Sequence, residues 1–196
     1  MLKIGLTGNM GSGKSTVASI FGCLNIPVYH ADEEAKKMYL RQDVKASAVE
    51  LLGLNILDAN GEIDRSSVAS LAFADPILLK KLTFLIHPLV RDDFREWLLH
   101  QPATPYIIHE TAILFESGFR NEVDLVIHVS CPETLAIERI QKRDRLPEEK
   151  IRERMRFQMK DSEKASRSDF VIINDGRTLV IPQVLEIHQE LLQRSP

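Results

Sequence analysis

The sequence predicts an α/β domain in which a parallel sheet of about five strands is flanked by helices, with a helical insertion and a helical lid. Short apolar runs alternate with amphipathic helical patterns towards both ends of the chain. A glycine-rich stretch follows the first apolar run, and residues 41–100 show helical periodicity with almost no strand pattern. We therefore expect a core of residues 1–40 and 101–196, an insertion of residues 41–100, and a lid of residues 139–165 within the core.

The composition is ordinary for a globular protein. The 196 residues carry a net charge of −3, and 44% of them are hydrophobic. No overall basic field favours nucleic acid, and no apolar run approaches the roughly 18 residues that a membrane span needs. Cys23 and Cys131 lie far apart, without the spacing of a disulfide scaffold or a zinc site, and we expect both in the core. We predict a cytoplasmic protein with no nucleic-acid, membrane or obligate protein partner.

The glycine-rich stretch from Gly8 to Ser15 fits G-x-x-x-x-G-K-[ST], the P-loop motif. It lies between an expected strand at residues 2–7 and an expected helix at residues 16–21, which is the context that the motif requires. Its glycines allow backbone N–H groups to surround phosphate oxygens, Lys14 adds a cation, and the hydroxyl of Ser15 can hold Mg²⁺. The nucleotide-binding residues predicted here are Gly8, Gly11, Ser12, Gly13, Lys14, Ser15 and Thr16.

Acidic residues follow two other expected strands. Asp32 comes after the run at residues 28–31, and Glu110 comes after the run at residues 106–109. The carboxyl ends of parallel strands form the ligand-binding edge of such sheets, so we expect both carboxylates there. Asp32 could act on an acceptor hydroxyl, or it could only cap the next helix. Glu110 could bind Mg²⁺ or position an acceptor, or it could only pair with Lys14.

The helical insertion is a candidate cover for an acceptor substrate. Asp64 could cap one helix, and Asp75-Pro76 could begin another that His87-Pro88 interrupts. Arg91 lies one turn after His87, and the two side chains could contact an anionic substrate. A lone histidine is more often a structural residue at a helix end.

A basic segment around residues 139–160 forms the expected lid. Interleaved acidic residues make a solvated charged face the ordinary explanation for most of these charges. An arginine from this segment could instead close over a γ-phosphate and stabilise the charge that develops during transfer. The last expected strand ends at Asn174, which could border the nucleotide.

Taken in order, these motifs resemble those of the dephospho-CoA kinases over nearly the full chain. The resemblance rests on residues 4–16, Asp32, residues 86–90, residues 114–116, Arg139, Arg143-Asp144, Gln158 and residues 174–176. Such proteins commonly have Asp-Val-Pro where this chain has Glu110-Thr111-Ala112, so the carboxylate here lies about one methylene further out.

The resemblance implies a P-loop NTPase fold of the nucleoside-monophosphate-kinase type. It also implies transfer of the γ-phosphoryl group of ATP to the ribose 3′-hydroxyl of dephospho-CoA, with ATP and Mg²⁺ as cofactors and ATP and dephospho-CoA as the only partners. Asp32 would orient or deprotonate the hydroxyl, Lys14 and Arg143 would neutralise developing charge, and Ser15 would hold Mg²⁺. The residues implied on the acceptor side are Asp32, His87, Arg91 and Glu110.

Two other functions remain open from the sequence. The first is another P-loop kinase, acting on a nucleoside monophosphate or a sugar-like alcohol. The second is a non-catalytic nucleotide-binding switch, which the D-x-x-G match from Asp58 to Gly61 favours. The absence of an N-K-x-D motif weighs against the switch.

Overall fold

The computed structural model describes residues 1–195 and divides the chain into two compact units. The core unit comprises Met1–His30 together with the chain from Gln101 onwards, and the helical unit comprises Ala31–His100. The division falls after His30, whereas the sequence placed it after residue 40. The helix that follows His30 therefore belongs to the helical unit.

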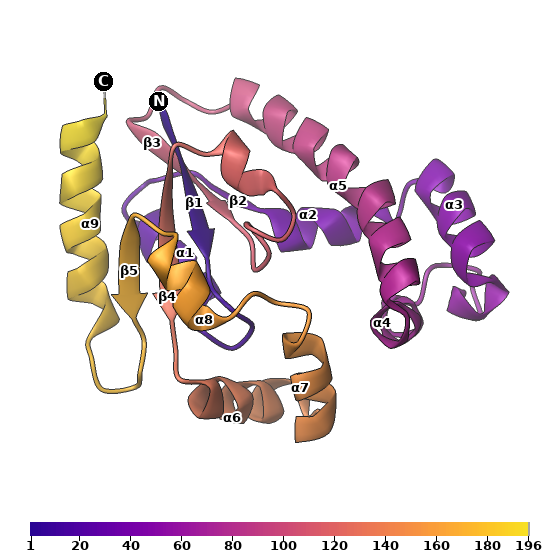
Figure 1. The fold of residues 1–196 in the computed structure, drawn as a ribbon. Helices are drawn as coiled ribbons and strands as arrows, with labels where there is room; N and C mark the ends of the chain where they lie inside the picture. The colour runs from indigo at the N-terminus through magenta and orange to yellow at the C-terminus, as the bar shows by residue number, and fades with distance from the viewer. Residues whose placement is uncertain (196) are drawn as a thin grey trace. The chain divides into compact units, whose positions relative to one another are not determined.

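The core unit is built on a parallel sheet of five strands in the order β2-β3-β1-β4-β5 (Figure 1). This confirms the predicted fold class. The strands are β1 (Leu2–Thr7), β2 (Val28–His30), β3 (Tyr106–Glu110), β4 (Leu125–Ser130) and β5 (Phe170–Ile173). Leu6 of β1 lies in register with Glu110 of β3, so Glu110 stands beside the start of the loop that follows β1. The chain crosses from one side of β1 to the other here, as at the ligand-binding edges of similar sheets.

Helices cover both faces of this sheet. The core-unit helices are α1 (Lys14–Cys23), η2 (Phe119–Glu122), α6 (Glu133–Asp144), α7 (Glu148–Met155), α8 (Asp161–Ser166) and α9 (Val180–Arg194). Phe21 of α1 and Val184 of α9 join alternate strand residues such as Ile4 in one fully buried cluster. The opposite face carries His128 of β4 and is covered by α8, whose Asp161 bonds to that histidine. Figure 1 shows α9 running along β5 at the edge of the sheet.

Helices α6 and α7 form the predicted basic hairpin. Their contact is apolar, because Ile140 of α6 and Ile151 of α7 are buried in one small cluster, against which Met10 of the P-loop packs. The P-loop therefore touches the base of the hairpin through a side chain as well as through its backbone.

The helical unit contains α2 (Ala31–Met38), α3 (Gln42–Leu52), η1 (Leu54–Ile56), α4 (Arg65–Ala74) and α5 (Pro76–Leu99). Side chains of Asp64 and Asp75 accept hydrogen bonds from the first backbone N–H groups of α4 and α5, which confirms both predicted helix starts. The expected interruption at His87-Pro88 is wrong, since α5 continues through Pro88. Buried residues recur every fourth position across the proline, at 82, 86, 90 and 94, so packing outweighs the one lost hydrogen bond.

Two smaller expectations also change. Asp32 is not the N-cap of α2, because that helix begins at Ala31, directly after β2, and Asp32 occupies its first turn. Its charge there still complements the positive end of the helix dipole. Cys131 is buried as expected, but Cys23 at the end of α1 is exposed. No helix within residues 1–195 is both long and apolar enough to cross a membrane.

Candidate active site

The P-loop connects β1 to α1 in the core unit, in a conformation that side chains would prevent. Gly11 and Gly13 have φ values of 80° and 90°, in the left-handed region. A Cβ at Gly11 would lie 2.5 Å from the carbonyl oxygen of Ala136, and one at Gly13 would lie 2.2 Å from Nδ2 of Asn174. The glycines of the motif are therefore required by close packing around the loop as well as by its backbone angles.

Lys14, the first residue of α1, forms a buried ion pair with Glu110 at the end of β3. The other oxygen of the Glu110 carboxylate lies 2.6 Å from Nδ1 of His30, and the hydroxyl of Ser15 lies 3.4 Å from the oxygen that faces Lys14. Glu110 is only 3% exposed. The pairing with Lys14, one of the alternatives expected from the sequence, is thus present, and it places a carboxylate beside Ser15.

Glu110 is held in its charged form. Burial opposes ionisation, but the charge of Lys14 and the hydrogen bonds from Lys14 and His30 outweigh it and keep the pKa of Glu110 below its ordinary value. Lys14 has three N–H donors, so it can hold Glu110 and still donate to a phosphate oxygen. His30 was not among the residues expected in this group, although β2 ends at His30.

The oxygens of Ser15 and Glu110 fit a Mg²⁺ ion bound together with phosphates. They are hard oxygen ligands from neighbouring elements, and Ser15 is exposed at the first turn of α1, as is Thr16. No group of three or more acidic, histidine or cysteine side chains within residues 1–195 could hold a metal ion. A cation here would need further oxygens from a ligand or water, as Mg²⁺ in phosphate sites usually does.

Arg139 and Asn174 hold the backbone of the P-loop in place through hydrogen bonds. Nδ2 of Asn174 donates to the carbonyl oxygen of Ser12 at 2.7 Å, and a guanidinium nitrogen of Arg139 donates to Oδ1 of Asn174 at 3.1 Å. Arg139 also approaches the carbonyl oxygens of Gly11 and Ser12 at 3.5 and 3.4 Å. The hydroxyl of Ser12 is buried and has no hydrogen-bond partner among the described residues, so it is available to a ligand in the loop.

The segment after α7 closes the other side of the loop. Oε1 of Gln158 accepts from the backbone N–H of Met10 at 3.0 Å, and the Met159 carbonyl accepts from the side chain of Asn9 at 3.1 Å. Glu116 accepts from the backbone N–H of Met159 at 2.8 Å. The segment that follows α7 is therefore attached to the P-loop by hydrogen bonds.

Lys164 supports this base from inside the protein. Its side chain is fully buried, with Nζ 2.6 Å from the Ala112 carbonyl oxygen and 2.9 Å from Glu116. Burial lowers the pKa of Lys164, and the bond to Glu116 opposes that shift. The sequence did not indicate this role, because Lys164 belongs to no motif and a lysine in a polar helical segment is usually a surface residue.

Arg143 is not brought to the P-loop in this structure. Its guanidinium forms two hydrogen bonds, of 2.7 and 2.8 Å, with the carboxylate of Asp144, and its side chain is 68% exposed. Among the arginines of α6, Arg139, one turn earlier, is the one that touches the loop.

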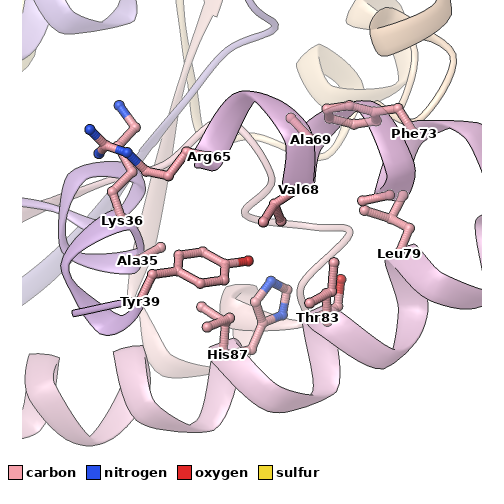
Figure 2. Close-up of a pocket in the computed structure, with 13 residues that line it drawn as sticks. Ala35, Lys36, Tyr39, Arg65, Val68, Ala69, Phe73, Leu79, Thr83 and His87 are labelled. Atoms are coloured by element: carbon pink, nitrogen blue, oxygen red, sulfur yellow. The ribbon is translucent and has the colours of Figure 1, made fainter. Parts of the chain in front are cut away.

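The helical unit contains a pocket of about 450 Å³, lined mostly by apolar side chains of α2, α4 and α5 (Figure 2). His87 lies in its wall, whereas Arg91 does not line it. Burial, and then the charge of Arg91, lower the pKa of His87, so that His87 is neutral at pH 7. Ala35 and Lys36 of α2 and Tyr39, which follows the helix, line the pocket, and Asp32 lies one turn before Lys36 on the same face of α2.

The chain matches the family model described as "Dephospho-CoA kinase" over residues 2–179. A dephospho-CoA kinase of Bacteroides fragilis is 40% identical over 194 residues, covering 98% of this chain and 94% of its own. A crystal structure of a Thermus thermophilus protein has a TM-score of 0.82 at 31% identity, with 98% of this chain and 97% of that chain covered.

The structure of a dephospho-CoA kinase from Campylobacter jejuni has a TM-score of 0.66 at 25% identity, covering 98% of both chains. Family model, relatives and structures agree along almost the whole length. The chain therefore belongs to the dephospho-CoA kinase family.

Proposed function

We propose that the protein transfers the γ-phosphoryl group of ATP to the ribose 3′-hydroxyl of dephospho-CoA, the last step of CoA synthesis. The match to the dephospho-CoA kinase family along residues 2–179 carries this proposal. In the reaction, a bond forms between the 3′-oxygen and the γ-phosphorus, and the bond from that phosphorus to the β–γ bridging oxygen breaks. The products are CoA and ADP, and the hydroxyl proton is released.

The core unit would bind ATP. Backbone N–H groups between Gly8 and Thr16 would surround the phosphates, and the buried hydroxyl of Ser12 would donate to one of their oxygens. Lys14 would donate to the γ-phosphate while it remains paired with Glu110. Mg²⁺ would supply positive charge at the phosphates when bound, held by Ser15, with Glu110 as the nearest carboxylate. Asn174 would act by holding Ser12 in place.

The helical unit would bind the acceptor. Asp32, in the first turn of α2, would accept a hydrogen bond from the 3′-hydroxyl, which orients its oxygen and takes up its proton as the new bond forms. His87 would contact the acceptor through its imidazole, which has an N–H donor even when it is neutral. Arg91 would act on the acceptor side through its charge.

Residues 139–165 would act as the lid. Within residues 1–195, the exposed Arg143 side chain is bound only to its neighbour Asp144, so lid closure would require Arg143 to exchange this carboxylate for phosphate oxygens. In the closed state Arg143 would stabilise the charge of the transferred group. Closure would also exclude water, which otherwise competes with the 3′-hydroxyl as acceptor.

The switch alternative has lost its sequence support. The D-x-x-G match lies in a turn of the helical unit, where Oδ1 of Asp58 accepts from the backbone N–H groups of Asn60 and Glu62 and Gly61 has a φ of 75°. Asp58 and Gly61 thus have a local structural role. The other alternative, a different P-loop kinase, would phosphorylate another acceptor, so the acceptor preference distinguishes it from a dephospho-CoA kinase.

The first test is release of ADP from Mg·ATP with dephospho-CoA, AMP, shikimate or no acceptor. We expect turnover with dephospho-CoA alone, and a fall in kcat of about 10²–10⁴ in Asp32→Asn with ATP binding unchanged. Glu33→Gln is the matched control, since it removes a neighbouring charge from the same first turn of α2. The proposal fails if AMP or shikimate is phosphorylated and dephospho-CoA does no better than buffer.

A further inference from the structure

The last residues of β2 and β3 lie side by side at the edge of the sheet that carries the P-loop. His30 ends β2, Glu110 ends β3, and the two are partners in the parallel register. Two residues earlier, Val28 and Ile108 pack in the core cluster that includes α1. Because side chains alternate along a strand, His30 and Glu110 point to that same face, beside the start of α1. The topology of the sheet therefore brings the imidazole next to the carboxylate.

The carboxylate of Glu110 is held from two sides. Lys14 and Ser15 are close to its Oε1, whereas Nδ1 of His30 lies 2.6 Å from its Oε2. Glu110 is ionised and can only accept, so the hydrogen of this short bond is on Nδ1 of His30. Both the neutral and the charged imidazole can carry a hydrogen there. With a donor at each oxygen, the plane of the carboxylate is fixed.

The bond from His30 relieves Lys14 of part of its task. Lys14 has three N–H groups, with which it pairs with Glu110 and would also donate to the γ-phosphate. Glu110 is buried, so a carboxylate oxygen that lost its donor there would be costly. Without His30, Lys14 would satisfy both oxygens by turning its ammonium group towards Glu110. That movement would take N–H groups of Lys14 away from a phosphate.

We propose that His30 is a positioning residue for phosphoryl transfer. By holding Oε2 of Glu110, His30 keeps Lys14 on the other oxygen, with N–H groups directed to the γ-phosphate. In this role His30 does not touch the nucleotide, and it acts through Glu110 and Lys14. The inference rests on the proposed function only for ATP as the ligand, and it does not depend on the acceptor.

Three substitutions distinguish the two nitrogens of the His30 ring. The side-chain nitrogen of asparagine is attached to Cγ, as Nδ1 of histidine is, so His30→Asn can keep the bond to Glu110. The nitrogen of glutamine is one bond further out, closer to the place of Nε2, and His30→Ala has no donor. Each protein is titrated calorimetrically with a non-hydrolysable ATP analogue and with ADP, with Mg²⁺ present.

The ratio of the two affinities is the readout, because ADP lacks the γ-phosphate. We expect His30→Ala to weaken binding of the ATP analogue about tenfold and of ADP at most about twofold. His30→Asn should bring the analogue back to within about twofold of the unmodified protein, and His30→Gln should not. A merely structural role would weaken both nucleotides alike. In a Lys14→Met background, His30→Ala should leave the ratio unchanged, since its effect passes through Lys14.

His188→Ala is the matched control. Nδ1 of His188 also lies 2.6 Å from a buried side-chain oxygen of β3, the hydroxyl of Tyr106, at the opposite end of the strand. This variant loses a comparable bond and should bind both nucleotides as the unmodified protein does. If His30→Ala folds poorly, His30→Gln, which keeps a polar side chain, replaces it in the comparison with His30→Asn.

Two results would overturn the proposal. One is an equal loss of affinity for the ATP analogue and ADP in His30→Ala. The other is a ratio that His30→Gln restores and His30→Asn does not, which would assign the role to Nε2. Dephospho-CoA is absent from these titrations and its turnover is measured separately, so a wrong acceptor in the proposed function is distinguishable from a wrong role for His30.

Discussion

The two units of this protein differ in whether their charged groups are buried and paired in the ligand-free structure. In the core unit, the charged groups at the P-loop are buried and already bound to one another, as in the pair of Lys14 with Glu110. In the helical unit, Lys36 and Arg65 are exposed and have no partner within residues 1–195, beside a mostly apolar pocket. The core fixes its polar geometry before any ligand binds, whereas the helical unit offers a shape and unpaired charge.

This difference determines what a substitution should do. Removing one member of a buried pair leaves the other charged and poorly solvated, so stability and activity fall together. Removing an exposed, unpaired cation changes ligand binding and leaves stability nearly unaltered. If substitutions in the two units had the same effects on stability and activity, the following experiments would contradict this distinction.

The largest effect should follow loss of Lys14. We expect Lys14→Met to lower kcat by about 10²–10³, because one donor to the transferred group is lost. It should also lower the free energy of unfolding by about 3–5 kcal/mol, since Glu110 stays buried without its cation. Steady-state kinetics and urea unfolding measure the two effects.

The double variant Lys14→Met/Glu110→Gln separates the effect on stability from the effect on activity. It removes the stranded charge, so it should recover much of the stability and none of the activity. Lys36→Gln, its counterpart in the helical unit, should unfold at the same urea concentration as the unmodified protein. If Lys14→Met is as stable as the unmodified protein, loss of the buried Lys14–Glu110 pair does not lower the free energy of unfolding, and the proposed distinction is wrong.

A smaller contrast is expected between two arginines of one helix. Arg143→Gln should lower kcat about 10²-fold without a change in thermal stability, because the side chain is exposed and would act only when the lid closes. Arg139→Gln should lower the free energy of unfolding by about 1.5–3 kcal/mol, because charged hydrogen bonds to Asn174 and the loop are lost. Equal losses of stability in both variants would contradict the division between an exposed arginine and a bracing arginine.

The parts of the fold that local patterns encode could be predicted from the sequence. The P-loop needs only the order of its glycines, Lys14 and Ser15, and the strands are short apolar runs ending at polar residues. The continuation of α5 through Pro88 could not, because it depends on packing partners that keep Leu82, Ile86 and Val90 on one buried stripe. Local propensity alone ends the helix there.

The site was harder to predict wherever contacts join distant residues. His128, Ser130 and Asp161 form a partly buried cluster, with Asp161 oxygens 2.9 Å from Nε2 of His128 and 2.6 Å from the Ser130 hydroxyl. No periodicity links a strand residue to a helix start 33 residues later. Arg139 and Arg143 pose the same difficulty, since one turn separates the arginine that touches the loop from the one that does not.

The smallest expected effect is a difference in acid sensitivity. Because the pKa of Glu110 is lower in the folded protein than its ordinary value, its stabilising contribution is complete above the ordinary carboxyl pKa of about 4.3 and is lost as the pH falls through the lower folded value. Glu110→Gln has no such contribution to lose. The gap in unfolding free energy between the unmodified protein and Glu110→Gln should therefore narrow from pH 6 to pH 3.

Asp64 in the helical unit provides the comparison for this last effect. Its hydrogen bonds to Ser67 and to backbone N–H groups also lower its pKa, but the carboxylate is a solvated helix cap that asparagine can replace. The gap between the unmodified protein and Asp64→Asn should therefore narrow in the same direction over this pH range, but by less, because solvent screens the exposed carboxylate. If both gaps narrow equally, burial of the Lys14–Glu110 pair does not distinguish the core unit, and the contrast between the two units would have to rest on the pocket alone.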